Sequence, residues 1–495
     1  MDQLISWFTS QGGAVDIEHF GLAEFPGQGW GAIALKDIPE GHVLFAIPRT
    51  LTLSTRSCAL LDLFGNNSWT SFQLHEGWAG LILCMMWEES MVEKSKWFQY
   101  FASLPSHFDT PMFWNDEELA ELRGTSVVGK IGRSEAENDY YNKVVPAVKS
   151  RPDLFFPEHL DRWYTLERYH IMGSRILSRS FQVEKWDPAA NDEEDDGVLQ
   201  PEMDVDGDDP TSAEPNEKDN DDVAEGHGGD SDDGDDGDDP GDVAMVPMAD
   251  ILNARFGCNN ARLFHEQLEL RMVTTESILA GNQIWNTYGE LPNSELLRRY
   301  GHVDVFDLPG GGQGNPEDVV EVPANVFVSP IIDISPKGMS VETLQERIDW
   351  WLEESGDDTF VIEAQKGLEI SPPLISFARL LLLSPKDWER AREKPKLPKP
   401  KLSEEDGPAV LDVISQGLQR MLDEFPSPIE TDWELLSKPD LPLRKRNAII
   451  VRAGEKRILL EVLNEVGQLQ KSRTTESKKR KQPGQTGSRA KKSKR

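Results

Sequence analysis

The amino-acid sequence predicts an α+β protein with at least two folded parts. Short apolar runs separated by turn residues over 29–53 are typical of strands, and similar runs return after residue 267. Apolar residues at helical spacing fill the stretch between these two regions and most of the C-terminal third. At about 100 to 200 residues per domain, a chain of 495 residues can form two or three domains, each with its own apolar core.

The expected elements follow in order along the chain. A helix is expected within 1–20, where Leu4, Ile5 and Phe8 recur at helical spacing. The expected strands are 32–35, 43–47, 51–53, 268–274 and 283–288, and the region 58–183 is expected to be helical. A sheet is therefore built from pieces on either side of a helical insertion. The glycine-rich stretch 310–314 is interpreted as a flexible linker to a separate, mainly helical domain, in which Trp350 and Trp351 are core residues.

The net charge of −35 is concentrated in one segment and opposed in another. Residues 187–243 hold 25 acidic side chains and one basic one, while residues 471–495 hold 11 basic side chains and one acidic one. Segments with so little apolar surface and so much self-repulsion cannot offset the entropy lost on ordering. We therefore expect a disordered acidic insertion at 187–243 and a basic disordered tail at 471–495.

Several classes of protein are disfavoured. Cys58, Cys84 and Cys258 leave an odd thiol and form no C-x-x-C pattern, so neither a disulfide framework nor a cysteine-built zinc site is expected. No apolar run reaches the 18 to 20 residues that span a bilayer, and residues 1–10 lack the pattern of a signal peptide. The motifs G-x-x-x-x-G-K-[ST], H-E-x-x-H and G-x-S-x-G are absent. We expect a soluble intracellular protein in a reducing compartment, with no membrane partner and no metal.

Five short patterns remain, and each has an ordinary interpretation when taken alone. Most of them could be explained by a hairpin turn, a cation at a helix end, a turn or cap residue, or a core tyrosine. Their joint order along the chain argues against those separate explanations. The patterns are Gly29-Trp30-Gly31 in a turn before a strand, Ser178-Arg179-Ser180-Phe181 ending a helix, Asp250-Ile251-Leu252-Asn253, Asn286-Thr287-Tyr288-Gly289 and Arg299-Tyr300-Gly301.

Together these patterns resemble the SET-domain protein lysine methyltransferases. The specific part is VPMADILN (246–253) followed by IWNTYGELPNSELLRRYGH (284–302), which resembles the subclass of the Rubisco large-subunit methyltransferase, SET-domain protein 6 and, nearest, the fungal ribosomal lysine methyltransferases. The resemblance implies a SET domain over 18–289 with small β-sheets in a pseudoknot-like arrangement, interrupted by the helical insertion at about 58–183. It further implies the end of the SET core and a linker at 290–314, then an all-α substrate-binding domain of the Rubisco-methyltransferase type over 325–465.

The resemblance also implies S-adenosyl-L-methionine as cofactor and a role for each matching residue. A lysine amine must lose its proton before it attacks a methyl group, which costs roughly 4 to 5 kcal/mol at pH 7 because its reference pKa is about 10.4. A tyrosine hydroxyl can orient the neutral amine, and the family pattern gives this catalytic role to Tyr288. The cofactor-binding residues implied are Gly29, Trp30, Gly31, Arg179, Asn253 and Tyr300, with Arg179 holding the cofactor carboxylate and Tyr300 packing on the cofactor. One position departs from the family, because Ala254 stands where a histidine usually follows the asparagine.

The expected function is methylation of a lysine on a non-histone protein, with a basic ribosomal protein as substrate and monomethylation favoured, all by resemblance. Two alternatives remain open: methylation of a nuclear factor or histone, and a catalytically silent SET-domain scaffold in the nucleus, which Ala254 keeps in consideration. The basic runs at 478–481 and 489–495 are typical of a nuclear localisation signal, with RNA contact and a tail without an address as other interpretations. We expect the nucleus, with the cytoplasm as a second compartment, and no direct binding of nucleic acid.

Overall fold

The computed structural model describes residues 2–184, 241–308, 311–334, 339–364, 370–402 and 407–480. The chain forms two compact units, Met1–Ser106 with Ser134–Glu290, and His107–Arg133 with Leu291–Arg495. Each unit has its own core of buried apolar residues. The segment His107–Arg133 belongs with the second unit although it lies inside the helical insertion, a feature that the sequence did not indicate. Among the described helices, none is both long and apolar enough to cross a membrane.

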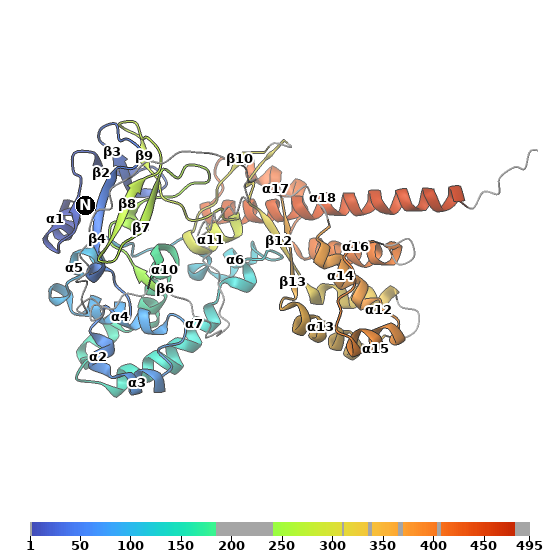
Figure 1. The fold of residues 1–495 in the computed structure, drawn as a ribbon, viewed down its shortest axis with the longest axis horizontal. Helices are drawn as coiled ribbons and strands as arrows, with labels where there is room; N and C mark the ends of the chain where they lie inside the picture. Colours follow the sequence, from blue (N-terminus) through green and yellow to red (C-terminus); the bar gives the residue numbers. More distant parts are fainter. Residues whose placement is uncertain are drawn as a thin grey trace, which may run out of the picture. The chain divides into compact units, whose positions relative to one another are not determined.

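Three small antiparallel sheets form the β part of the first unit (Figure 1). Their strand orders are β1-β4-β8-β7, β2-β3-β9 and β5-β6. Each sheet joins segments that are far apart in the sequence; β4 pairs with β8 through Ala46↔Arg271 and its neighbours. The strands are β1 Ala14–Val15, β2 Phe20–Phe25, β3 Gly29–Ala34, β4 Val43–Pro48, β5 Ser180–Glu184, β6 Gly241–Met245, β7 Ala261–His265, β8 Glu269–Thr274 and β9 Gln283–Ile284.

Apolar residues place the helices of the first unit against these sheets. Helix α4 is buried along almost its whole length, and it packs on α10, whose first turn is capped by the Thr165 hydroxyl accepting from the Arg168 amide. Helix α10 ends at Arg179, and β5 begins at the next residue. The helical elements are α1 Asp2–Ser10, η1 Arg49–Leu51, α2 Leu60–Phe64, α3 Asn66–Ser71, α4 Ala79–Ser90, η2 Val92–Lys94, α5 Phe98–Ser103, α7 Arg133–Asp139 at the unit boundary, η5 Tyr140–Val144, α8 Val145–Ser150, η6 Pro157–His159, α9 Leu160–Trp163, α10 Leu166–Arg179 and η8 Ala249–Ile251.

Several expected elements differ from the structure of the first unit. The helix expected within 1–20 is confirmed as α1, but residues 51–53 form the end of η1 and one bridge, Leu53↔Met245, rather than a strand. Only Gln283–Ile284 of the expected strand 283–288 is extended and paired. Residues 241–243 of the expected disordered insertion belong to β6, because the ladder with β5 satisfies their backbone groups. The rest of that insertion, 187–240, lies outside the described residues.

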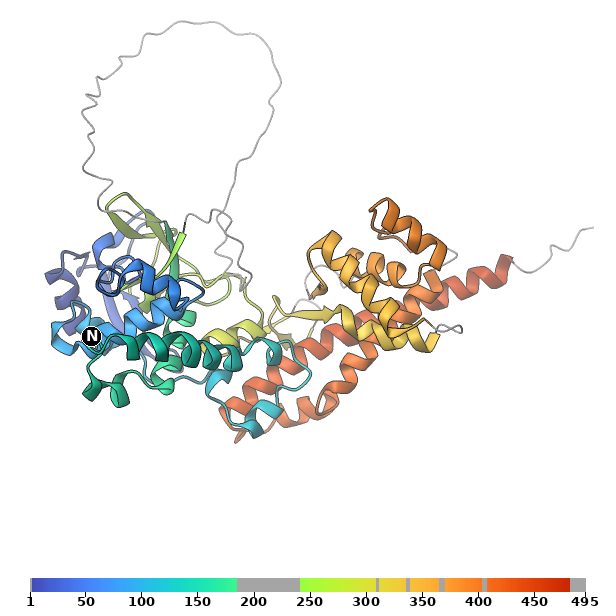
Figure 2. The same cartoon turned by 90° about the horizontal axis from the view of Figure 1, so that it is seen from below.

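The second unit is mainly helical, as expected, and Figure 2 shows a group of helices beside the long α18. Helix α16 packs closely enough on η9 that a Cβ on Gly417 would lie 2.4 Å from the ring of Phe327. The elements are η3 Pro111–Phe113, α6 Asp116–Ala120, η4 Val128–Lys130, α11 Asn293–Tyr300, β10 Phe306–Asp307, β11 Gln313–Gly314, β12 Val319–Pro323, η9 Ala324–Phe327, α12 Val328–Ile334, α13 Val341–Ser355, β13 Thr359–Glu363, α14 Pro372–Leu381, α15 Pro385–Glu393, α16 Gly407–Glu424, α17 Ile429–Leu436 and α18 Leu443–Arg480.

Three details of the second unit correct the expectations. The ladder β12-β13 adds a strand to a region expected to be all-α. The glycine-rich stretch includes β11, which pairs with β10, so part of the expected flexible linker is a short hairpin. Helix α18 continues through 471–480, because Lys, Arg and Glu are good helix formers and extend it past the expected start of the tail. Residues 481–495 of the tail lie outside the described part of the chain. Trp350 and Trp351 are buried in the core of this unit, as expected.

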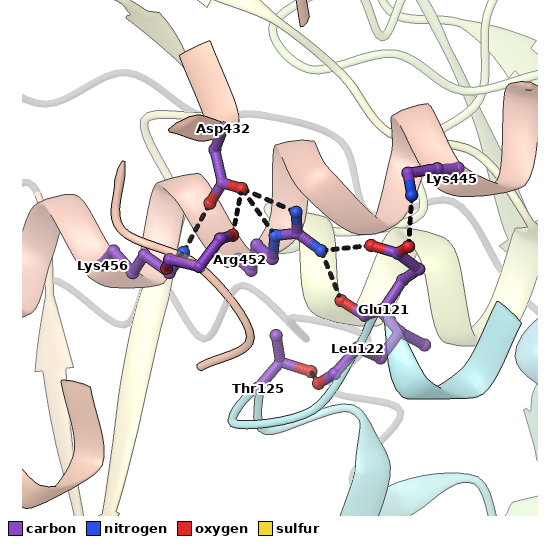
Figure 3. Close-up of polar contacts among 8 residues, drawn as sticks. Glu121, Leu122, Thr125, Asp432, Lys445, Arg452 and Lys456 are labelled. Atoms are coloured by element: carbon purple, nitrogen blue, oxygen red, sulfur yellow. Dashed lines mark hydrogen bonds and ion pairs between the residues drawn. The ribbon is translucent and has the colours of Figure 1, made fainter. Parts of the chain in front are cut away.

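A chain of charged groups fastens residues 107–133 to α17 and α18 within the second unit (Figure 3). Arg452, on α18, is 2% exposed and donates to the fully buried carboxylate of Asp432 at 2.6 and 2.9 Å. The same guanidinium donates to the carboxylate of Glu121 at 2.7 Å and to its backbone oxygen at 3.0 Å. Lys456 donates to Asp432, and the more exposed Lys445 donates to Glu121. Arg452 is therefore the residue that joins α17, α18 and the segment after α6.

We predict that Arg452→Ala destabilises the second unit strongly. The substitution leaves the buried Asp432 with Lys456 as its cation and removes both bonds to Glu121, and breaking a buried pair in this way typically costs about 3–5 kcal/mol. Lys445→Ala is the matched control, since it removes another cation of the same helix at a more exposed pair worth about 0–1 kcal/mol. Urea denaturation of both variants measures the difference. Equal stability of the two variants would show that the network contributes little.

Candidate active site

Two irregular segments of the first unit cross beside strand β3. One follows η8 and the other follows β9, and the Asn286 amide donates to the Asn253 carbonyl at 2.9 Å. Ala254 and Asn286 form a parallel bridge at the same place, while β9 is paired to β3 through Ala32↔Ile284. The chain thereby brings the segment 249–254, the segment 284–288 and the start of β3 together, which is the pseudoknot-like arrangement expected for a SET domain.

The first predicted motif opens strand β3 directly after a tight turn. Gly29 has φ +73°, a conformation that disfavours side chains, and it pairs with Phe25 across the hairpin. Trp30 is 45% exposed. Gly31 faces the crossing point, because an added Cβ would lie 2.5 Å from Asn253 Nδ2 and 2.9 Å from Gln283 Nε2. The motif is thus the first three residues of a strand rather than the turn before it.

Two amide groups beside Gly31 have unused hydrogen-bonding capacity. The side-chain nitrogens of Asn253 and Gln283 are buried and find no hydrogen-bond partner among the described residues. A buried donor left unpaired costs about 1–3 kcal/mol, so such groups usually serve a ligand or an ordered water. Two orphaned donors next to a glycine that leaves the space clear fit a polar cofactor such as the one the resemblance implies. Gln283 was not among the predicted site residues; its place beside Gly31 depends on the β3-β9 pairing.

A buried carboxyl group, Asp250, lies on the other side of the same segment. It accepts a hydrogen bond from the Tyr100 hydroxyl at 2.9 Å, and Arg179 lies 3.8 Å from the same carboxylate oxygen. Burial raises the pKa of Asp250 to about 6, against the lowering effect of Arg179 and Tyr100. Arg179 also donates to the Asp250 backbone oxygen at 2.5 Å. The sequence pattern included Asp250 but did not indicate a role for it. Tyr100 lies in the helical insertion, where no sequence signal distinguished it.

Tyr288, the predicted catalytic residue, shares this environment. Its hydroxyl donates to the Leu252 carbonyl at 3.4 Å, a long bond. Burial raises the pKa of Tyr288, the nearby positive charge of Arg179 lowers it, and the Asp250 carboxylate raises it. A raised pKa keeps the hydroxyl protonated at neutral pH, so it can both donate and accept hydrogen bonds. The structure therefore brings Arg179 and Tyr288 together around Asp250, as neighbours of Asn253.

A strained residue precedes this cluster. Met248 has φ +76°, although it is not a glycine, and its side chain is completely buried. Such a conformation costs of order 1–3 kcal/mol and persists only where the surroundings impose it, most often at functional sites. Here the strained residue turns the chain from β6 into η8, which directs Asp250 into the interior.

Tyr300 is the one predicted site residue outside the first unit. It ends α11 in the second unit, followed by Gly301 in the left-handed conformation, and its ring contacts His302 with centroids 5.9 Å apart. Its predicted contact with the cofactor stays a prediction. Ala254, where the family usually has histidine, is half-buried in the bridge with Asn286. The roles of all predicted site residues stay predictions too, although the positions of five of them, Gly31, Arg179, Asn253, Tyr288 and the flanking Trp30, belong to one region of one unit.

Comparisons with known proteins agree with this geometry. A family model described as "Rubisco LSMT substrate-binding" matches residues 341–459, inside the predicted substrate-binding range. The mouse N-lysine methyltransferase SETD6 is 27% identical over 461 residues, covering 88% of this chain and 84% of the mouse protein. Ribosomal lysine N-methyltransferase 4 of Saccharomyces cerevisiae is 29% identical over 280 residues, covering 56% of this chain and 49% of the yeast protein.

Solved structures agree on the fold. The structure of Rubisco LSMT bound to AdoMet has a TM-score of 0.64 and 18% identity, and the match covers 98% of this chain and 97% of that one. These findings confirm the predicted SET fold with its C-terminal substrate-binding domain and the predicted resemblance to the SET-domain protein lysine methyltransferases of the Rubisco LSMT and SETD6 type. The neighbour carries AdoMet in its own structure, and S-adenosyl-L-methionine stays the predicted cofactor of this chain.

We predict that Gly31→Ala lowers the affinity for S-adenosylmethionine by about 5- to 150-fold, because one methyl group would displace the amides of Asn253 and Gln283, and losing two hydrogen bonds costs about 0.5–1.5 kcal/mol each. Gly173→Ala is the control in the same unit, since its added methyl group would meet only Ile82 at 3.6 Å. Isothermal titration calorimetry of both variants measures the affinity, and circular dichroism checks the fold. An affinity unchanged in a folded Gly31→Ala protein would remove these amides from the cofactor site.

Proposed function

We propose that this chain transfers one methyl group from S-adenosyl-L-methionine to a lysine of a basic ribosomal protein. The observation that carries the proposal is the convergence in one unit of two unpaired buried amide nitrogens, of Asn253 and Gln283, with the buried Asp250 and its neighbours Arg179 and Tyr288. The two amides and Arg179 can hold a polar cofactor, and the Tyr288 hydroxyl can hold an amine in a fixed direction.

The residues of the site can do three things for such a reaction. Buried surroundings penalise a charged lysine, so they favour the neutral amine that attacks. The Tyr288 hydroxyl, kept protonated by its raised pKa, can hold that amine through a hydrogen bond. Holding two reactants at contact distance supplies much of the acceleration in a transfer of this kind. The bound cofactor would supply an electrophilic methyl group on a sulfonium cation.

Arg179 is suited to the acidic end of the cofactor. One nitrogen of its guanidinium donates to the Asp250 backbone oxygen, and the group has five N–H donors in a rigid fork that matches a carboxylate. Its side chain is 29% exposed, so it is accessible from solvent. The neighbouring Asp250 carboxylate and the helix end at residue 179 fix the direction of the fork. This arrangement supports the predicted role of Arg179 in binding the cofactor carboxylate.

The proposed substrate follows from a relative and from the charge of the chain. The yeast relative carries the name of a ribosomal lysine methyltransferase, and a chain with a net charge of −35 attracts basic partners such as ribosomal proteins. Monomethylation is proposed from the family resemblance. The alternative of a silent scaffold is favoured by one observation, Ala254, which lacks the imidazole of the usual family residue.

We predict that Tyr288→Phe keeps cofactor affinity but lowers the rate of methyl transfer by about 10²-fold, the size of effect expected when two reactants are misplaced. The measurement is transfer of labelled methyl groups into proteins of a methyltransferase-deficient extract, followed by mass spectrometry of the labelled product. Tyr141→Phe serves as control, because Tyr141 is 57% exposed in the same unit. A labelled lysine of a ribosomal protein, formed by the control and greatly reduced with Tyr288→Phe, would support the proposal. Cofactor binding without transfer by the unaltered chain would favour the scaffold.

We also propose that the protein is a nuclear one, directed by the basic C-terminal residues. A chain without residues 471–495 should then lose nuclear accumulation, because 11 basic side chains are removed. Fluorescence microscopy of tagged full-length and shortened chains measures the distribution. Since α18 is helical through Arg480, a second chain shortened only after residue 482 separates damage to the helix from loss of the signal. Unchanged nuclear accumulation of both shortened chains would contradict this proposal.

A further inference from the structure

A cluster of two histidines and one aspartate lies in the first unit, outside the site described above. Among the described residues, Asp16, His19 and His42 form the one group of at least three metal-ligand side chains whose donor atoms all lie within 4.8 Å of one another. Asp16 Oδ2 lies 2.8 Å from His19 Nδ1 and 2.7 Å from His42 Nε2. The two imidazole rings have centroids 4.9 Å apart. Asp16 directly follows β1, His19 directly precedes β2, and His42 directly precedes β4.

The backbone holds the three residues in place independently of their side chains. The Asp16 amide donates to the Leu44 carbonyl at 2.9 Å, which ties the end of β1 to β4. The His42 amide donates to Thr274 Oγ1 at 2.9 Å, and the Thr274 amide donates back to the His42 carbonyl at 3.0 Å. His19 directly precedes β2. The donor atoms therefore converge because three strands fix their positions, and a binding site on rigid elements needs little rearrangement.

The Asp16 carboxylate is also oriented. Its other oxygen, Oδ1, accepts from the Glu18 amide at 3.0 Å, so Oδ2 faces the two histidines. The side chains of all three residues are 26–27% exposed, which lets an ion and a water molecule reach the donor atoms. A hydrogen bond from the protein that orients a ligating group is typical of metal sites.

We propose that Asp16, His19 and His42 bind a divalent transition-metal ion, with Zn²⁺ as the ion that fits best. Two imidazole nitrogens and one carboxylate oxygen suit zinc and its neighbours and disfavour Mg²⁺ and Ca²⁺, which prefer oxygen ligands. Three protein ligands leave a fourth position for water in a tetrahedral site. At metal–ligand distances of about 2.0–2.2 Å, ligand atoms of such a site lie roughly 3.3 Å apart, so each of the two observed separations needs to widen by only about 0.5 Å.

The ion has a structural role, because none of its three ligands belongs to the residues assigned to the cofactor. Phe20, next to His19, pairs with Ala34, whereas Gly29 pairs with Phe25 at the other end of the same two strands. Strands rise about 3.3 Å per residue, so Gly31, three residues from Ala34 along β3, lies roughly 10 Å from the end of the hairpin that holds His19. The ion would join the turn between β1 and β2 to the start of β4. Metal binding should accordingly raise stability and leave cofactor affinity unchanged.

Titration of the metal-free chain with ZnCl₂ alone, followed by calorimetry, tests the proposal. We expect one ion per chain whose affinity falls at least ~10–100-fold in His42→Gln, since even groups that only support a ligand are worth that much. His75→Gln is the matched control, because His75 is an exposed histidine of the same unit outside the cluster. The same titrations on a chain without residues 190–241 remove the carboxylates of the acidic segment as weak ion sites.

Two further measurements separate metal binding from a folding defect. Glutamine at position 42 retains an amide N–H that can donate to Asp16, so the metal-free His42→Gln protein should melt at the same temperature as the metal-free wild type. Saturating Zn²⁺ should raise the melting temperature of the wild type and of His75→Gln by about 5–10 °C and leave that of His42→Gln unchanged. Absence of a bound ion in the wild type, retention of the ion by His42→Gln, or its loss from both variants would overturn the proposal and leave Asp16 as a hydrogen-bond acceptor between two histidines.

Discussion

The active-site region of the first unit depends on one backbone contact, the hydrogen bond from the Asn286 amide to the Asn253 carbonyl. Neither segment is a regular helix or strand at this point, so the crossing has few other backbone bonds to hold it. Its position follows from neighbouring pairings, β3 with β9 on one side and β5 with β6 on the other. Residues more than 200 positions apart in the sequence meet there, and each proposed role of Gly31, Asn253 and Tyr288 requires that they do.

Strained backbone and unsatisfied polar groups lie next to that crossing. Met248 adopts a left-handed conformation, Asp250 is buried with a raised pKa of about 6, and the amides of Asn253 and Gln283 lack partners among the described residues. Each feature lowers stability by itself, and a large apolar core in the same unit offsets the cost. Buried polar groups that lack partners in the protein, next to a strained backbone, are typical of a site that binds polar ligands such as a cofactor and an amine.

The sequence was sufficient for the architecture because the architecture depends on local patterns. Helical spacing located α4, α10, α13, α16 and α18, and the short apolar run at 268–274 located β8. Residues 51–53 were misassigned because a short apolar run has the same appearance in a strand and in a turn over the core. The attachment of residues 107–133 to the second unit could not be predicted, because it rests on the pairing of Arg452 with Glu121 and Asp432, which no local pattern contains.

The residues of the site also fall into those that a local sequence pattern indicates and those that only the folded structure brings together. Tyr288, Asn253 and Arg179 could be named because each belongs to a contiguous phrase of the family pattern, whereas Tyr100 and Gln283 could not, since their contacts exist only after the sheets form. The cluster of Asp16, His19 and His42 is the extreme case. Asp16 and His19 are three residues apart, a spacing that means nothing by itself, and His42 joins them only because β4 lies between β1 and β8. Strand order therefore determines where chemistry can occur in this unit, both at the crossing and at the cluster of Asp16, His19 and His42.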